Sequence, residues 1–416
     1  MSNEQETPRH LVVQPDARSL AERSTASLLT RGTELALQLR EDDNVRDNIR
    51  KAAEQGDAIA QFELGARYYD GDGVPKDEAE AVKWYRKAAE QGFACAEFNM
   101  GVCYSNGQGI PKDEVEAVNW YRRAAEHGLL SAQSCLGFCY AKGQGVSKDY
   151  AEAVKWFRKA TEQGNAKGQF GLGLAYAHGQ GVAKDDAEAA KWFRKAAEQG
   201  DADAQFSLGA YYDSGQGVAE DKEEALGWYR RAADQGHDAA QNNLGVCYAN
   251  GNGVPKDEVE AVKWYRKAAV QGDAQAQLSL GCCYANGQGV AKDDVEGVKW
   301  FRRAAAQGFA KAQFNLGFCC ANGRGVPKDD EEAAECYRNA AEQGHAGAQF
   351  KLGVCYAHGE GVPKDNVEAY KWLNLAGQTL ENARNAQAEV GSKMTSQQIA
   401  EAEKLSGDWK RKRSKT

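Results

Sequence analysis

A unit of 36 residues recurs through most of this chain, and its period constrains the fold more than any single motif does. A glycine in the middle of the unit occurs nine times without a slip, at Gly65, Gly101, Gly137, Gly173, Gly209, Gly245, Gly281, Gly317 and Gly353. A fixed period long enough for two short helices is typical of a solenoid, in which each unit packs only on its neighbours. We therefore expect nine such units between Asp57 and Leu380.

The first half of each unit has the pattern of an amphipathic helix. In the first unit Ala60, Leu64 and Tyr68 follow one another at intervals of four residues, which places them on one side of a helix. Asp57 is the expected N-cap, and the helix should end near Gly71, where glycine can adopt the left-handed conformation.

The second half of the unit predicts another helix, with a start signal of its own. Asp77 is followed three residues later by Glu80, the spacing of a capping box in which each side chain bonds to the other residue's backbone N–H. Trp84 and Tyr85 belong to its apolar side, and the tryptophan recurs in every unit except the eighth, which has Cys336. Two short helices cannot cover each other's apolar sides, so neighbouring units must stack.

These patterns predict an all-α protein, an α-solenoid forming a right-handed superhelix of nine 36-residue helix-turn-helix repeats. The expected organisation is a disordered or loosely structured leader at 1–43, a capping helix at 44–56, the repeats at 57–380, capping helices at 381–407 and a basic tail at 408–416. Thr395 and Gln398 form a further capping box in the C-terminal segment.

Composition narrows the possible partners. The net charge of −8 is spread over interspersed acidic and basic residues, so we expect protein partners and no nucleic acid. The polar stretch from Met1 to Pro15 lacks the apolar core of a signal peptide, and no apolar run is long enough to enter a membrane. We expect a cytoplasmic monomer, although the leader could also be an export signal. The basic tail is expected to be a solvated end, with a targeting or anionic-surface role as the alternative.

The unit as a whole carries a family resemblance. It reads Ala-x-x-x-Leu-Gly-x-x-Tyr-x-x-Gly-x-Gly-Val, then Lys-Asp, then Ala-x-x-Trp-Tyr/Phe-Arg-Lys-Ala-Ala-x-x-Gly, and it resembles the Sel-one-like repeat, a longer-looped relative of the tetratricopeptide repeat. The resemblance implies a non-enzymatic adaptor that binds a peptide or protein partner on the concave solenoid face. A secreted or host-directed bacterial interaction factor is an alternative. A third possibility is the β-lactam binding or hydrolysis associated with some cysteine-rich relatives, from which this chain departs because it lacks a Ser-x-x-Lys motif.

A comparison of the units with one another locates the expected binding surface. Residue identity varies freely at the positions of Ile59, Glu63 and Asp70, which lie within about 40° of one another on the first helix. The position of Ala66, beside them, is apolar but variable. We name these four positions and their equivalents in the other units the first-helix face, and predict that it grips an extended peptide or a partner helix. The competing interpretation is that the apolar residues pack sideways and the polar ones are merely solvated. The residues expected to contact a partner are Asn99, Val102, Phe138, Lys142, Lys167, Leu174, His178, Asp203, Asn243, Val246, Asn315, Phe318, Lys351, Val354 and His358.

Motifs for metal binding and catalysis are absent from the sequence, so neither a cofactor nor an enzymatic activity is expected. The six histidines do not have metal-ligand spacing, and Gly71-x-Gly73 lacks the rest of a phosphate loop. Six of the eleven cysteines share one position in the unit. Equivalent points of neighbouring units should lie about 10 Å apart, too far for a disulfide. We interpret these cysteines as small buried hydrophobic residues.

Overall fold

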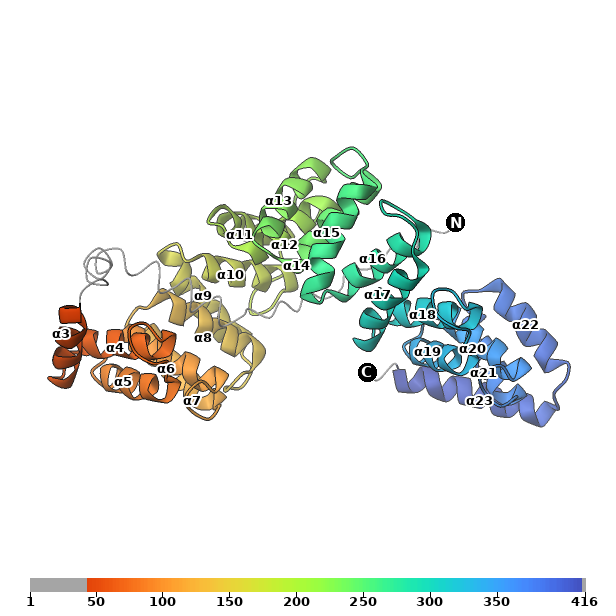
Figure 1. Ribbon diagram of the computed structural model, residues 1–416, viewed down its shortest axis with the longest axis horizontal. Helices are drawn as coiled ribbons and strands as arrows, with labels where there is room; N and C mark the ends of the chain where they lie inside the picture. Colours follow the sequence, from red (N-terminus) through yellow and green to blue (C-terminus); the bar gives the residue numbers. More distant parts are fainter. Residues whose placement is uncertain (1–42, 414–416) are drawn as a thin grey trace. The chain divides into compact units, whose positions relative to one another are not determined.

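The computed structural model describes residues 43–413, which form twenty-one α-helices and no strand (Figure 1). The prediction of an all-α repeat fold is confirmed. The chain divides into two compact units, unit 1 ending at Asp221 and unit 2 beginning at Lys222. The predicted leader, except for Asp43, lies outside the described residues.

The helices alternate between the two halves of the repeat. The first helices are α4 (Ala58–Asp70), α6 (Ala94–Asn106), α8 (Leu130–Lys142), α10 (Ala166–His178) and α12 (Ala202–Ser214) in unit 1, and α14 (Asp238–Asn250), α16 (Ala274–Asn286), α18 (Ala310–Asn322) and α20 (Ala346–His358) in unit 2. The second helices are α5 (Glu78–Glu90), α7 (Glu114–Glu126), α9 (Tyr150–Glu162) and α11 (Asp186–Glu198) in unit 1, and α13 (Lys222–Asp234), α15 (Glu258–Gln271), α17 (Asp294–Ala306), α19 (Asp330–Glu342) and α21 (Asn366–Ala376) in unit 2. Helix α3 (Asp43–Glu54) precedes them, and α22 (Glu381–Gly391) and α23 (Ser396–Arg413) follow.

The ends of the first helices follow from local chemistry. The backbone N–H of Ala60 donates to Asp57 Oδ1 at 2.7 Å, so Asp57 is the predicted N-cap. Gly71 ends the helix with φ of 77°, and its N–H donates to the Arg67 carbonyl at 2.8 Å. Three repeats have an apolar residue at the cap position and no side-chain cap bond: Phe93, Leu129 and Phe309.

Only one of the two hydrogen bonds of the capping box predicted for the second helix forms. The Glu80 N–H donates to Asp77 Oδ1 at 2.9 Å, as expected. The reciprocal bond is replaced, because the Asp77 N–H donates to the Tyr68 carbonyl at 2.8 Å and the Glu80 carboxylate accepts from Lys83 Nζ at 2.7 Å. The turn between the two helices therefore satisfies the donor that the sequence pattern assigned to glutamate.

The capping box predicted at the start of α23 is complete. The Gln398 N–H donates to Thr395 Oγ1 at 3.3 Å, and the Thr395 N–H donates to Gln398 Oε1 at 2.9 Å. At this helix no tertiary contact competes for the Thr395 N–H, so the local pattern alone decides the geometry.

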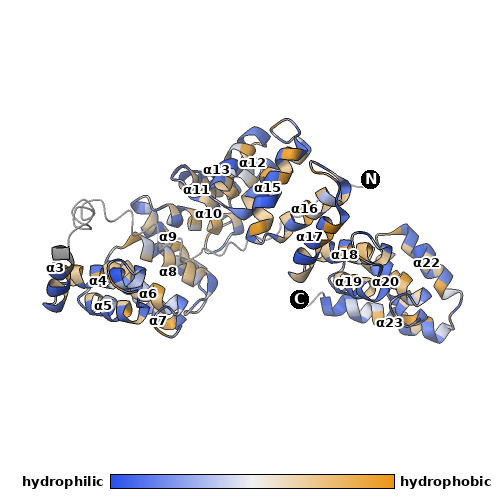
Figure 2. Cartoon of the chain, in the orientation of Figure 1, coloured by the Kyte–Doolittle hydropathy of each residue, from blue (hydrophilic) through white to orange (hydrophobic). Residues whose placement is uncertain are grey.

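Within a repeat the two helices pack closely because the recurrent glycine has no side chain. A Cβ atom on Gly65 would lie 2.7 Å from Cδ1 of Tyr85, well inside van der Waals contact. The ring of Tyr85 is only 3% exposed, and Ala88 and Ala89 beside it are fully buried. Hydrophobic and hydrophilic residues alternate along the helices in Figure 2, as expected for helices that bury one side. The glycine is thus a packing requirement of the pair.

Buried glutamines connect most repeats to the helix that precedes them, whereas the second repeat has Glu97 at this position. Gln61 accepts a hydrogen bond from Gln91 of its own repeat at 2.8 Å and donates to the Ala53 carbonyl of the preceding helix at 3.1 Å. The same arrangement recurs in unit 2 around Gln241, Gln277 and Gln313. Each bond contributes about 1 kcal/mol, and an unpaired buried amide would cost more. Successive repeats within each unit therefore stack in one register.

The recurrent tryptophan lies under a basic side chain of its own helix. Trp84 is buried, and the Lys87 ammonium lies 3.8 Å from its ring centroid. Equivalent pairs recur in seven successive second helices, α5 to α17. Truncation of such a buried indole should cost about 3–5 kcal/mol. In these second helices the basic side chain three residues after the tryptophan therefore packs on the tryptophan ring.

The two ends of the described chain have helices outside the repeats. Helix α3 packs on α4, with Ala53 buried. Helix α23 packs along α21, where Trp409 meets Trp372 edge to face at 6.3 Å between ring centroids. The sequence predicts a basic tail at 408–416, but α23 continues to Arg413 because the Trp409 contact anchors its last turns. No helix of residues 43–413 is long and apolar enough to cross a membrane.

Candidate functional site

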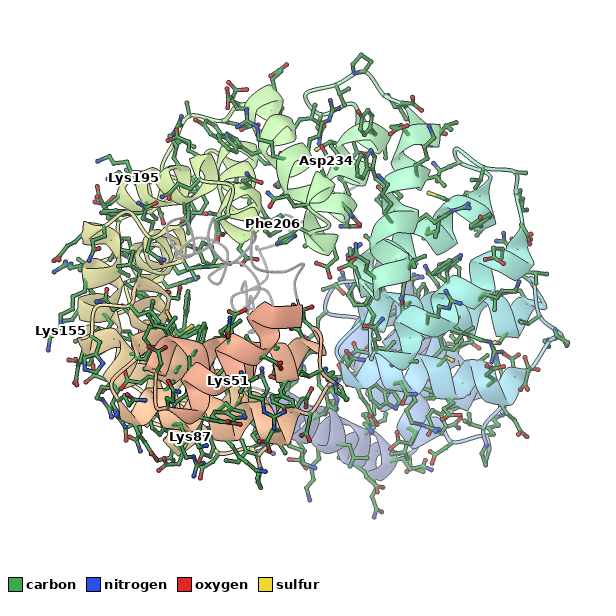
Figure 3. The ribbon with its side chains drawn as sticks, turned by 60° about the vertical axis from the view of Figure 1, so that its left-hand side comes forward. Lys51, Lys87, Lys155, Lys195, Phe206 and Asp234 are labelled. Carbon is green, nitrogen blue, oxygen red and sulfur yellow. The ribbon has the colours of Figure 1, made fainter. Side chains whose placement is uncertain are left out.

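The first-helix face is divided between the two units. Its predicted residues from Asn99 to Asp203 belong to unit 1, and those from Asn243 to His358 belong to unit 2. Within unit 1, Figure 3 shows Lys155 and Lys195, on second helices, at one edge of the ribbon, and Phe206, on a first helix, at the opposite edge. Phe206 lies next to the face on its helix, at 100° per residue. The first-helix face and the lysines of the second helices therefore lie on different sides of unit 1.

The apolar positions of the face differ in exposure. Val102 is only 6% exposed and packs in a cluster with Phe98 and Tyr121, so the sideways-packing interpretation holds for this residue. Leu174, Val246 and Val354 are half-buried. Phe138 is also half-buried, and its ring meets Phe157 edge to face at 4.9 Å. Phe318, at 36% exposure, is the most open of the predicted apolar residues.

Lys167 and Asp203, two predicted contact residues, bind each other. They occupy the same position in successive repeats, and Lys167 Nζ lies 2.8 Å from Asp203 Oδ2 and 3.0 Å from Asp201 Oδ2. Burial acts to lower the pKa of Lys167, but the two carboxylates outweigh it and raise the pKa. This lysine stays charged and neutralised within the chain, so its charge is already used to join the fourth and fifth repeats.

The asparagines of the face also have neighbours within the chain. Asn315 Nδ2 donates to Cys282 Sγ of the preceding repeat at 3.7 Å. Asn243 Oδ1 accepts a long bond of 3.5 Å from Asn242, and Asn99 lies beside the Tyr85 hydroxyl group. These side chains are half-buried, and a carboxamide group offers several donor and acceptor sites. They can therefore offer hydrogen bonds to a partner without breaking the stack.

The remaining predicted residues are basic side chains. Lys142 and His178 are exposed at equivalent positions of α8 and α10, and Lys351 is half-buried on α20. The pKa of Lys142 is lowered by partial burial, an effect that the nearby Cys139 thiol opposes. His358 Nδ1 lies 3.8 Å from Glu360 Oε1 at the surface.

Arg67 also belongs to this region, although it is not among the predicted contact residues. Its side chain is buried at the position where other repeats have cysteine, and its Nε lies 3.4 Å from Glu63 Oε1. The sequence does distinguish Arg67, because the first repeat is the only one with a basic residue at the position of the cysteine row. Glu63 itself, a member of the face, is therefore paired.

Two thiols lie on the face or beside it, those of Cys135 and Cys139. Burial raises the pKa of Cys135 and of Cys139 to about 12, which keeps both thiols protonated and poorly nucleophilic. All eleven cysteines are free, so the expectation that the cysteine row is not bridged is confirmed. Among the residues that the structure describes, no three His, Cys, Asp or Glu side chains are grouped so as to hold a metal ion.

Comparison with known proteins gives a consistent result. A family description named Sel1 repeat matches the chain over residues 58–93, 96–129, 130–165, 166–201, 202–237, 238–273, 274–309, 310–345 and 346–378. The chain is 36% identical to c5321, described as a protective antigen present in uropathogenic Escherichia coli strains and displaying an SLR fold, with a TM-score of 0.53 over 95% of this chain and 94% of that one. It is 34% identical to a Sel1 repeat protein from Oxalobacter formigenes, with a TM-score of 0.55 over 76% of this chain and 92% of that one. No curated protein matches it.

Proposed function

This chain belongs to the Sel1 repeat family, whose members generally serve as protein–protein interaction scaffolds, and from that premise we propose that it is a non-enzymatic scaffold that holds an extended segment of a partner polypeptide on its first-helix face. The segment would follow the concave side of the repeats, with its apolar side chains on the Ala66 row and its polar groups on the neighbouring positions.

One observation carries the proposal: the residues that change from repeat to repeat gather on the first-helix face, whereas the residues that recur pack inside the stack. Gly65 recurs nine times because Tyr85 fills the space that a side chain would need. The position of Ile59, by contrast, holds residues as different as Ile59 itself, Ser131 and Gln275. Packing does not explain such variety, whereas recognition of a partner with a changing sequence along its length does.

The exposure of the face supports a polypeptide partner. Phe318 leaves more than a third of its surface in solvent, and Leu174, Val246 and Val354 are half-buried. Half-exposed apolar side chains bordered by amides and lysines offer an extended peptide both apolar burial and hydrogen-bond partners for its backbone. Burial of such a row supplies affinity at about 25 cal/mol per Å² of apolar surface before the costs of ordering the peptide.

Selection from a displayed random peptide library against the full chain tests the proposal. Selected peptides are then titrated, by fluorescence anisotropy, with two variants of the face, Phe318→Ser and Lys351→Glu. The matched controls are Val295→Ser, which removes a valine 53% exposed on α17, and Lys299→Glu, which reverses an exposed charge on the same helix.

We expect the two face variants to weaken binding by about tenfold or more and the two controls to leave it unchanged. Circular dichroism establishes that all four variants are folded. If the selected peptides bind all variants equally, or lose affinity only with the α17 controls, the first-helix face is not the binding surface and the proposal is wrong.

A further inference from the structure

One part of the face in unit 1 has a distinctive geometry, because α8 and α10 contact each other directly. The ring of Phe157, on α9, fits between Gly137 of α8 and Gly171 of α10. A Cβ atom on either glycine would lie 2.5 Å from Phe157 Cε1. All eight other repeats carry a side chain at the position of Gly171, the smallest being the serines Ser207 and Ser279. The two glycines let both first helices close on the same ring.

Two pairs of residues occupy equivalent positions on these two contacting helices. Phe138 and Leu174 are the apolar members, both half-buried, and Lys142 and His178 lie one turn further along their helices, both exposed. At 100° per residue, residues four positions apart on the same helix, such as Phe138 and Lys142, point in similar directions. We name these four residues the α8–α10 surface. It combines a small apolar floor with a basic border.

Lys142 differs from the other lysine of this region in its surroundings. Lys167 has two carboxylates within 3.0 Å, whereas no carboxylate of residues 43–413 forms an ion pair with Lys142. The Glu114 carboxylate, which also lies near Cys139, is paired with Lys112 at 3.0 Å. Partial burial removes some of the water that would otherwise solvate the Lys142 ammonium group. An arriving carboxylate would restore the lost stabilisation.

We propose that the α8–α10 surface recognises an acidic peptide segment, with a bulky apolar side chain of the segment on Phe138 and Leu174 and an adjacent carboxylate paired with Lys142. The inference rests on the proposed function and adds the chemistry of the partner at the third and fourth repeats. Neighbouring thiols remain neutral and so add no negative charge that would oppose a carboxylate, and the Glu114 carboxylate is paired with Lys112. A basic segment would meet Lys142 as a like charge and be rejected.

The charge and the apolar floor have separable contributions, and the test uses both. Two fluorescein-labelled peptides are synthesised, one in which Leu alternates with Glu and one in which Leu alternates with Gln. Their affinity for the full chain is measured by anisotropy at low and at high salt. The same measurement is made with Lys142→Gln, with Leu174→Ser and with Lys155→Gln, a control that removes an exposed lysine of α9.

We expect the Glu peptide to bind about tenfold more tightly than the Gln peptide at low salt, a difference of about 1.4 kcal/mol. High salt and Lys142→Gln should each remove most of this preference, because both act on the ion pair. Leu174→Ser should weaken both peptides and keep their ratio, and Lys155→Gln should change neither.

The outcomes separate this inference from the proposed function. If library-selected peptides bind the first-helix face but the Glu and Gln peptides bind equally, or Lys142→Gln leaves the preference intact, the inference is wrong and the scaffold function stands. If neither the selected peptides nor the synthetic ones bind the folded chain, the scaffold function is wrong and the inference falls with it.

Discussion

The recurrent glycine of the first helices allows a sharp test of the packing argument, because unit 2 contains a matched pair. Gly245 lies inside α14, where a Cβ atom would be 2.7 Å from the Tyr265 ring and 3.2 Å from the Ala261 carbonyl oxygen. Gly227 lies inside α13, where a Cβ atom would have no neighbour within 4 Å. Neither glycine has a positive φ, so alanine strains neither backbone. The two Gly→Ala substitutions therefore differ only in the space available.

Two opposing effects set the expected magnitudes. Replacement of glycine by alanine inside a helix stabilises the protein by about 0.5–1 kcal/mol through the entropy of the unfolded chain. Forcing a methyl group into a packed core costs about 1–3 kcal/mol. At Gly245 the second effect dominates, because the buried Tyr265 ring cannot move aside, and we expect a net loss of about 1–2 kcal/mol. At Gly227 only the first effect operates, and a gain of about 0.5–1 kcal/mol should follow.

The assay is urea unfolding followed by circular dichroism, with hydrogen exchange of α14 and α15 as a local readout, since repeat arrays can open in parts. A double variant, Gly245→Ala with Tyr265→Ala, should lose less stability than the sum of the two single variants, because the clash is gone. The reasoning is refuted if Gly245→Ala is as stable as the parent, or if Gly227→Ala destabilises by the same amount.

Three further predictions concern titratable and reactive groups. His345 Nδ1 accepts the Ala348 N–H at 3.1 Å, and burial, then the charge of Lys311, lowers the His345 pKa. The contribution of the neutral His345 to the free energy of unfolding should therefore be fully present above about pH 6.5 and be lost as the pH drops through the lowered pKa. His345→Asn should remove that loss in urea unfolding measured as a function of pH. The fully buried Glu97 contacts His127 Nδ1 at 2.7 Å and Arg123 Nε at 3.1 Å. Glu97→Gln with His127→Gln introduces the glutamine pair of other repeats and should stay within about 1 kcal/mol of the parent in urea unfolding. Arg123→Ala with His127→Ala leaves the buried carboxylate unpaired and should cost more. Thiol titration of the unreduced protein should count eleven thiols in denaturant and show slow labelling of the folded chain, because burial raises the thiol pKa values; fewer than eleven would contradict the unbridged structure.

Local patterns in the sequence were sufficient for the helices. Asp57 and Gly71 bound α4 as predicted, because a cap bond and a left-handed glycine involve only neighbouring residues. The complete capping box of Thr395 shows the same rule. At Asp77 the prediction was half wrong, since the Asp77 backbone N–H donates to the carbonyl of Tyr68 and not to the side chain of Glu80. That contact closes the turn between two helices, and a pattern within one helix does not contain it.

The candidate face was predictable as a set of positions but not as a set of available groups. Exposure of an apolar position depends on which side chains the adjoining helices place beside it, and the same row therefore holds the buried Val102 and the open Phe318. Likewise, the charge of Lys167 is used by Asp203, whereas Lys142 has no such neighbour in the described chain. These differences in exposure and in ion pairing depend on the side chains that neighbouring repeats place beside each residue.

By itself the sequence determined the number, order and approximate limits of the helices and their grouping into nine pairs, because helix periodicity and caps act over a few residues and the period repeats them. Only the tertiary structure decided which side chains of the first-helix face are engaged and which are open. The contact of α8 with α10 exists because Gly137 and Gly171 share the Phe157 ring, three residues from three helices. Packing of this kind depends on shape in three dimensions, which a linear pattern specifies only after the helices have met.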